Sequence, residues 1–239
     1  MATNPYSPDF LADLERTISV ARLSRYMRAT GGDQAKALKL YEDNIAVSEA
    51  LFGFLHSLEV AVRNSLHYEM TTALTGMDWL RDGLPLPWRT IPGLRLTVPM
   101  NNMIHDARQA AGTGAPIGKI IAELPFGFWP SLVSGQFHPL WSACLHKAFP
   151  HAHVPRRDVH WRLEVIRRLR NRIAHHEPIL TSNNEVYTGF TAQPTITLTQ
   201  LLQCVYWISP ATAQWMTSCT RYVQAGAILT ACHGSGVVL

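Results

Sequence analysis

One short segment of the chain places a histidine, an asparagine and several arginines close together. Residues 167–177 read RRLRNRIAHHE, with Arg170, Asn171 and His175 inside six consecutive positions. A histidine can exchange protons near neutral pH because its ordinary pKa is about 6.5, and an arginine carries a permanent charge suited to phosphate oxygens. The segment is therefore a candidate for proton transfer beside a bound phosphate.

The spacing within this segment limits how its side chains can meet on a helix. Asn171 and His175 are four residues apart and share one helix face, whereas Arg170 and His175 lie about 140° apart around an ideal helix. Three arrangements could bring Arg170 to His175: the arginine reaches round, the helix unwinds at the histidine, or two copies of the helix share one site. The alternative is a basic surface helix whose histidines lie near its negative C-terminal end, which is favourable by itself.

A second polar line is formed by Glu59, Arg63 and His67, which follow one another at intervals of four residues. On a helix they share one face, and burying them without partners would be costly. They therefore pair with one another, meet solvent or line a site. A solvated face with a Glu59–Arg63 ion pair, worth about 0.3–0.5 kcal/mol, is the simpler interpretation.

The basic residues of the chain are mostly arginines, and they are clustered. The net charge is +4, and arginine supplies 17 of the 21 basic residues. Seven arginines lie between Arg156 and Arg172, and three more recur at Arg22, Arg25 and Arg28. Genome composition could explain the preference for arginine but not its clustering. Because the guanidinium group binds phosphate through two parallel hydrogen bonds, the clusters favour an anionic polymer as partner.

Helical periodicity dominates the rest of the sequence. Apolar residues in steps of three, four and seven predict a long helix over 35–74. A second strong helix is predicted over 156–176, ended by Pro178. The remaining helices are expected at 8–29 (in two pieces), 101–111, 117–124, 137–149, 195–207 and 210–232, with an aromatic turn at 125–130. Ser7, Asp33 and Ser209 are the predicted N-caps.

These elements predict an all-α protein built as one domain over residues 1–239. Four principal helices suggest a helical bundle. The region 76–155 contains several glycines and prolines, so we expect a loop-rich, partly helical insertion between the long helix and the helix that carries Arg170. We expect this insertion to pack beside the bundle.

Several classes of protein are disfavoured by composition. The four cysteines are widely spaced and none forms a C-x-x-C pair, so neither a disulfide framework nor a zinc site is expected. The pair His151 and His153 is a weak metal signal, and we expect no metal and no cofactor. The N-terminus lacks the pattern of a signal peptide, and the apolar stretch 201–232 is interrupted by polar residues. We therefore expect a cytoplasmic protein without membrane contact.

Residues 170–175 resemble the Arg-x4–6-His motif of HEPN domains, including the usual polar residue after the arginine. The longer string LRNRIAHHEPI at 169–179 resembles the Abi-like (abortive infection) branch of that superfamily. Further strings similar to this branch lie at 22–26, 37–44, 58–64 and 124–129, so the resemblance runs from about residue 10 to about 225. It implies a HEPN-like helical bundle that forms a homodimer, with two motifs meeting in one shared active-site cleft.

The resemblance also implies metal-independent RNA cleavage by a toxin or an anti-phage effector. Arg170 and His175 take the catalytic places and Asn171 the polar place. By its chemistry, His175 would act as general acid and base while Arg170 stabilises the charged phosphorane. The 2′-hydroxyl would attack, leaving a 2′,3′-cyclic phosphate and a 5′-hydroxyl. Flanking phosphates are expected at Arg167, Arg168, Arg172 and Arg63, with supporting roles for Glu59 and His176.

Other functions stay open at this level. A HEPN-type module could bind RNA, a nucleotide or a protein without cutting, or a basic helical face could bind an acidic partner. In HEPN–nucleotidyltransferase pairs the partner modifies a tyrosine two residues after the motif histidine. Here that position is Glu177, so the chain lacks the tyrosine that this control requires. A different antitoxin or regulatory partner is compatible with the sequence.

Overall fold

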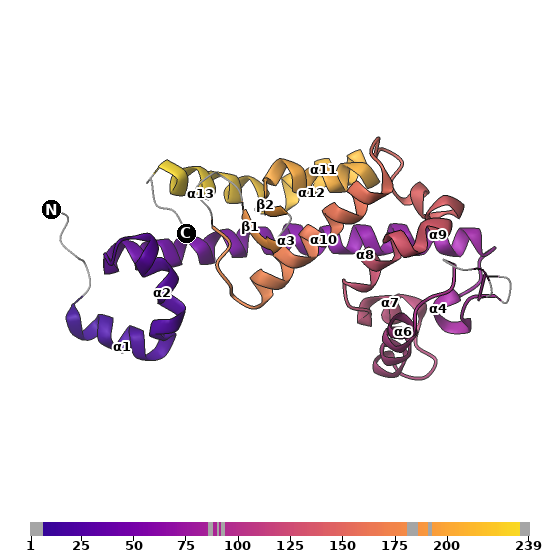
Figure 1. Ribbon diagram of the computed structural model, residues 1–239, viewed down its shortest axis with the longest axis horizontal. Coiled ribbons are helices and arrows are strands. Elements are labelled where there is room, and N and C mark those ends of the chain that lie inside the picture. Colours follow the sequence, from indigo (N-terminus) through magenta and orange to yellow (C-terminus); the bar gives the residue numbers. More distant parts are fainter. Residues whose placement is uncertain are drawn as a thin grey trace. The chain divides into compact units, whose positions relative to one another are not determined.

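The computed structural model of the protein describes residues 7–85, 88–89, 91, 94–180, 186–190 and 193–234. The chain is mostly helical and belongs to the all-α class, which confirms the predicted class (Figure 1). It divides into two compact units. The first contains Met1–Phe54, Arg168–Gln200 and Met216–Leu239, and the second contains Leu55–Arg167 and Leu201–Trp215. The second unit includes all of the region 76–155.

The first unit begins with the helices α1 (Pro8–Ile18) and α2 (Val20–Ala29), the two predicted pieces. Ser7 caps α1 by accepting from the backbone N–H of Phe10 at 3.2 Å. Ser19 separates the helices because its φ of +78° leaves the helical region, and its side chain caps α2. Their apolar faces form a small core with the start of α3, made of Leu14, Ile18, Leu23, Met27, Leu38 and Tyr41.

Helix α3 (Gln34–Ala73) contributes residues 34–54 to the first unit and 55–73 to the second. Asp33 caps it, accepting from the backbone N–H of Lys36 at 3.0 Å. The predicted apolar face is confirmed, since its members are all buried: Leu40, Val47, Leu51, Leu55, Leu58 and Val62. In the described part of the chain, α3 alone is long and apolar enough to cross a membrane, a criterion that core helices also meet. We interpret it as a core helix because this apolar line packs inside the protein.

In the second unit, α6 (Val98–Ala111) and α7 (Ile117–Glu123) lie side by side (Figure 1). The prediction of a turn at 125–130 is wrong in part, because α8 (Phe128–Leu132) begins inside it. The single helix expected at 137–149 is broken into η1 (Gly135–Phe137), α9 (His138–Ala143) and η2 (Leu145–Ala148). The break lies at Cys144, whose φ of −151° is outside the helical range. The short helix α4 (Trp79–Asp82) lies near the start of this region.

The motif helix α10 (Arg156–Ala174) contributes residues 156–167 to the second unit and 168–174 to the first. After it, β1 (Val186–Phe190) and β2 (Gln193–Ile196) pair antiparallel, with Val186 opposite Ile196. The prediction of a helix from residue 195 is wrong at its start, because α11 (Leu198–Ile208) begins after β2. Thr197 and Gln200 fix that start through two reciprocal side-chain hydrogen bonds to backbone N–H groups, of 3.0 and 3.1 Å.

The C-terminal region forms two helices, α12 (Pro210–Cys219) and α13 (Tyr222–Gly234), where the sequence predicts one over 210–232. Ser209 caps α12, accepting from the N–H of Thr212 at 3.2 Å. At the break, the hydroxyl of Thr220 donates to the carbonyl of Met216 at 2.6 Å. The N–H of Thr220 donates to the same carbonyl at 3.2 Å, so the helical bonding of α12 continues to Thr220.

The buried phenol of Tyr26 leads to a prediction about stability. Among the described residues its hydroxyl has no hydrogen-bond partner, and burial, reinforced by Tyr41, raises its pKa to about 12. We expect Tyr26→Phe to leave stability at pH 7 unchanged or increased, because the unpartnered hydroxyl is removed. Between about pH 10 and 12 the unfolded tyrosine loses its proton before the folded one, so the wild type loses stability there.

Urea unfolding from pH 7 to 11 measures this difference. The Tyr26→Phe protein should lose less stability than the wild type as the pH rises. Tyr206→Phe is the matched control, since the Tyr206 side chain is 50% exposed. Equal alkaline losses in the wild type and Tyr26→Phe would contradict the prediction.

Candidate functional site

Helix α10 ends in a hydrogen-bonded cap directly after the Arg-x4-His motif. The N–H of His175 still donates to the carbonyl of Asn171 at 2.9 Å, as in a regular α-helix. The next two N–H groups turn back: His176 donates to Ile173 at 3.0 Å and Glu177 donates to Arg172 at 2.8 Å. His176 has a φ of +56°. These bonds and this left-handed residue form a Schellman motif, in which His175 is the C-cap that follows Ala174, the last residue of α10.

This cap removes one of the three arrangements that the spacing allowed for Arg170 and His175. The helix unwinds at His176, one residue too late to rotate His175 towards Arg170. The two residues therefore keep their separation of about 140° around the helix. His175 is exposed, while Arg170 and Asn171 are half-buried. Either Arg170 reaches round the helix or two copies of the helix contribute to one site.

The guanidinium of Arg172 contacts neighbouring groups of its own chain. Its Nη2 donates to the carbonyl of Pro178 at 2.8 Å, and its Nη1 forms a 2.8 Å ion pair with Glu177. Its guanidinium also lies over the ring of Tyr187, 4.7 Å from the centroid. Burial lowers the pKa of this guanidinium. These contacts give Arg172 a positioning role in the turn after the motif, and its expected contact with phosphate stays a prediction.

Helix α2 brings two arginines of the N-terminal cluster to the same end of α10. Nη1 of Arg22 donates to the carbonyl of His176 at 2.6 Å, and Arg25 lies 5.2 Å from the ring centroid of Tyr187. Within the described ranges, neither arginine forms an ion pair with a carboxylate. The sequence indicates the cluster but not its place. No local pattern marks Tyr187 as the ring shared by Arg25 and Arg172.

Asn44 connects the segment after the motif to α3, a role that the sequence predictions did not include. Its side chain is 3% exposed, and its Oδ1 accepts from the N–H of Ile179 at 2.8 Å. The available signal was an amide at position 44 in the apolar line between Leu40 and Val47. A buried amide side chain is tolerated in an apolar line when it forms a hydrogen bond with a buried backbone group.

Replacing Asn44 by alanine should therefore lower the stability of the protein. The substitution leaves the buried N–H of Ile179 without its acceptor, which costs about 1–3 kcal/mol. Urea unfolding measures the change. Asn102→Ala, on the exposed side of α6, is the matched control and should change stability by less than about 0.5 kcal/mol. Equal stability of the Asn44→Ala and wild-type proteins would show that the hydrogen bond contributes nothing.

The other predicted site residues are divided between the units. Arg168 belongs to the first unit and is half-buried. Glu59, Arg63 and Arg167 belong to the second and are half-buried as well. Arg167 pairs with Glu164 at 2.8 Å, so its guanidinium has a partner inside the chain. Their expected phosphate-binding and supporting roles stay predictions.

His67 continues the polar line of Glu59 and Arg63 in the second unit. Its ring lies 5.9 Å from that of Trp79, centroid to centroid, and its Nε2 is 3.4 Å from the hydroxyl of Thr71. Burial lowers the pKa of His67, which keeps the ring neutral at pH 7. This histidine is thus packed in its unit rather than offered to solvent as a cation.

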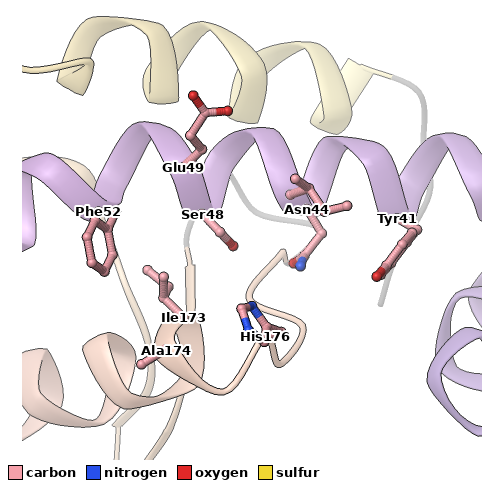
Figure 2. A pocket seen from close by; sticks show the side chains of 9 residues that line it. Tyr41, Asn44, Ser48, Glu49, Phe52, Ile173, Ala174 and His176 are labelled. Carbon is pink, nitrogen blue, oxygen red and sulfur yellow. The ribbon is translucent and has the colours of Figure 1, made fainter. Parts of the chain in front are cut away.

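A pocket of about 630 Å³ lies in the first unit between α3 and the end of α10 (Figure 2). Its lining comes from both helices and from the cap: Tyr41, Asn44, Ile45, Ser48, Glu49, Phe52, Ile173, Ala174 and His176. The two neighbours of His175 in the chain, Ala174 and His176, thus both line this pocket. The carboxylate of Glu49, at its edge, pairs with Arg221.

Comparison with known proteins gives no family for this chain. No family model, no curated protein and no solved structure matches it. The similarity of its motif strings to the Abi-like branch of HEPN domains therefore stays a resemblance. In the described ranges, no three His, Cys, Asp or Glu side chains gather as metal ligands.

Proposed function

We propose that this protein is a metal-independent endoribonuclease with a HEPN-like helical bundle, acting as a homodimer with a shared active-site cleft. The observation that carries the proposal is the end of α10. There an exposed His175 follows Arg170 by five residues, and Arg22 of α2 contacts the cap. A toxin or anti-phage effector of the cytoplasm, with RNA as its target, is the biological role that the resemblance supports.

In the proposed reaction, His175 takes the proton of the 2′-hydroxyl as general base. The 2′-oxygen forms a bond to phosphorus, and the bond from phosphorus to the 5′-oxygen breaks. The departing 5′-oxygen receives a proton, from the His175 imidazolium or from the same residue of a second copy. Arg170 stabilises the negative charge on the non-bridging oxygens, and Asn171 orients His175 or the phosphate. The products are a 2′,3′-cyclic phosphate and a 5′-hydroxyl, and side chains carry out every proton transfer and charge stabilisation in this scheme.

The test compares RNA and single-stranded DNA of the same sequence, incubated with purified protein in the presence of a metal chelator. RNA should be cut and DNA should stay intact, because DNA lacks the 2′-hydroxyl nucleophile. End-group analysis should find 2′,3′-cyclic phosphates and 5′-hydroxyls. Cleavage of DNA at a similar rate, or 5′-phosphate ends, would contradict the mechanism. Salt-dependent RNA binding without cleavage would favour the non-catalytic alternative.

A further inference from the structure

The pocket beside the motif offers chemistry that the proposed cleavage step does not use. Figure 2 shows Tyr41, Ser48 and Phe52 projecting from one side of α3 towards His176 and the end of α10. The side chains of Ile45 and Phe52 are 50% and 56% exposed. Two exposed large apolar side chains at one concave site favour an occupant with an apolar face.

The volume of this pocket and the side chains that line it indicate which kind of ligand would fit. A volume of about 630 Å³ lies within the range of small-ligand sites. Tyr41 and Phe52 supply aromatic rings, while Ser48 and His176 supply polar groups at the edge. A nucleobase matches this combination, because it is a flat ring with hydrogen-bonding groups at its edge. Any nucleobase can stack on an aromatic side chain. A purely apolar partner would leave these polar groups unpaired.

The surroundings of the pocket fit the phosphate that a nucleotide carries. Arg22 donates to the carbonyl of His176, a residue of the pocket lining. His176 follows His175 directly, and consecutive α-carbons are about 3.8 Å apart. A base in the pocket would therefore lie beside the chain segment that carries His175 and beside the carbonyl that Arg22 contacts.

We propose that this pocket binds one nucleobase of the RNA strand, next to the phosphodiester that His175 acts on. This inference rests on the proposed function and extends it, because the pocket would fix which linkage is cut. The ring of Phe52 stacks on the base, and Ser48 and His176 contact its edge. The enzyme would then prefer particular bases at that one position.

The test uses RNA tetranucleotides with 2′-O-methyl groups, which cannot be cut through the 2′-oxygen, so binding is measured apart from activity. Calorimetry compares the wild type with Phe52→Ala, which removes the stacking ring, and Ser48→Trp, which fills the pocket. Both variants should bind at least about tenfold more weakly and lose any base preference. Tyr68→Ala is the matched control, because Tyr68 is an aromatic residue of α3 that is 66% exposed. It should bind within about twofold of the wild type, as surface changes usually do.

The outcomes separate this inference from the proposed function. If the wild type cuts RNA while Phe52→Ala and Ser48→Trp bind and cut like it, the base pocket is overturned and the ribonuclease stands. If no RNA is cut but both variants lose oligonucleotide binding, the pocket is supported and the cleavage mechanism fails. If Ser48→Trp changes only the sedimentation of the protein and not its binding, the pocket holds a second copy of the chain and the inference is overturned.

Discussion

His175→Ala should reduce RNA cleavage by about 10²–10⁴-fold, the usual contribution of general acid–base catalysis. Arg170→Ala should cost about 10²–10³-fold through the loss of charge stabilisation on the phosphorane. Both losses should appear in kcat rather than in binding, since these groups act most strongly on the transition state. Single-turnover cleavage of a labelled RNA, with the enzyme in excess, measures the chemical step.

A histidine outside the proposed site provides the matched control for this experiment. His105 is exposed on α6, and His105→Ala should cut RNA at the wild-type rate. Because His175 is also exposed, its replacement should leave the unfolding midpoint unchanged. If His175→Ala cut RNA at the wild-type rate, the proposed mechanism would be wrong, even if the protein binds RNA.

Mixing the two inactive variants distinguishes the two arrangements that the α10 cap leaves open. If Arg170 of one copy acts with His175 of the other, a heterodimer of Arg170→Ala and His175→Ala contains one complete site. Random exchange of subunits should then restore about a quarter of the wild-type activity, since about half the dimers are mixed and each has one site intact. If Arg170 reaches round its own helix, each site lacks one residue and mixing restores nothing.

Local signals in the sequence predict most of the helices and their beginnings. The hydroxyls of Ser7 and Ser209 and the carboxylate of Asp33 cap their helices as expected, because an N-cap depends on residues within one turn. The apolar line of α3 is equally local, since its spacing repeats along one helix. The helix start predicted at residue 195 was wrong, although a local signal for the true start exists. Thr197 and Gln200 have the spacing of a capping box.

Such local signals do not predict contacts between segments that are distant in the sequence. The bond of Asn44 to Ile179 joins residues 135 positions apart. The sequence indicates that an amide interrupts an apolar line, but not which backbone group it satisfies. Arg172 illustrates the same limit, since its place in a run of arginines suggests a free cation. Its contacts with Glu177, Pro178 and Tyr187 depend on how the chain turns after α10.

The candidate site was predictable as a segment but not as a geometry. Residue types and spacing identify Arg170, Asn171 and His175, and the helical angle limits how they meet. The Schellman cap removes one of the three possibilities, because the left-handed residue that follows the helix is His176 rather than His175. No sequence pattern predicts the neighbouring pocket, since its walls come from α3 and from the end of α10 with its cap, more than a hundred residues later.

The largest stability effect should follow Trp129→Ala in the second unit. Trp129 is 0% exposed, and its ring packs edge-on against Phe128 and Trp79 at centroid distances of 5.1 and 6.5 Å. Removing a buried aromatic ring costs about 3–5 kcal/mol, from lost burial and from the cavity left behind. The indole nitrogen has no hydrogen-bond partner among the described residues, so the loss comes from packing alone.

Urea unfolding followed by circular dichroism measures this effect, with Trp215→Ala as the matched control. Trp215 belongs to the same unit and is 59% exposed, so its removal should cost less than about 1 kcal/mol. Because the chain has two compact units, Trp129→Ala should lower the unfolding transition of the second unit and leave that of the first in place. Trp129→Phe keeps a ring and should recover part of the lost stability. Equal losses for Trp129→Ala and Trp215→Ala would show that this aromatic cluster does not hold the second unit together.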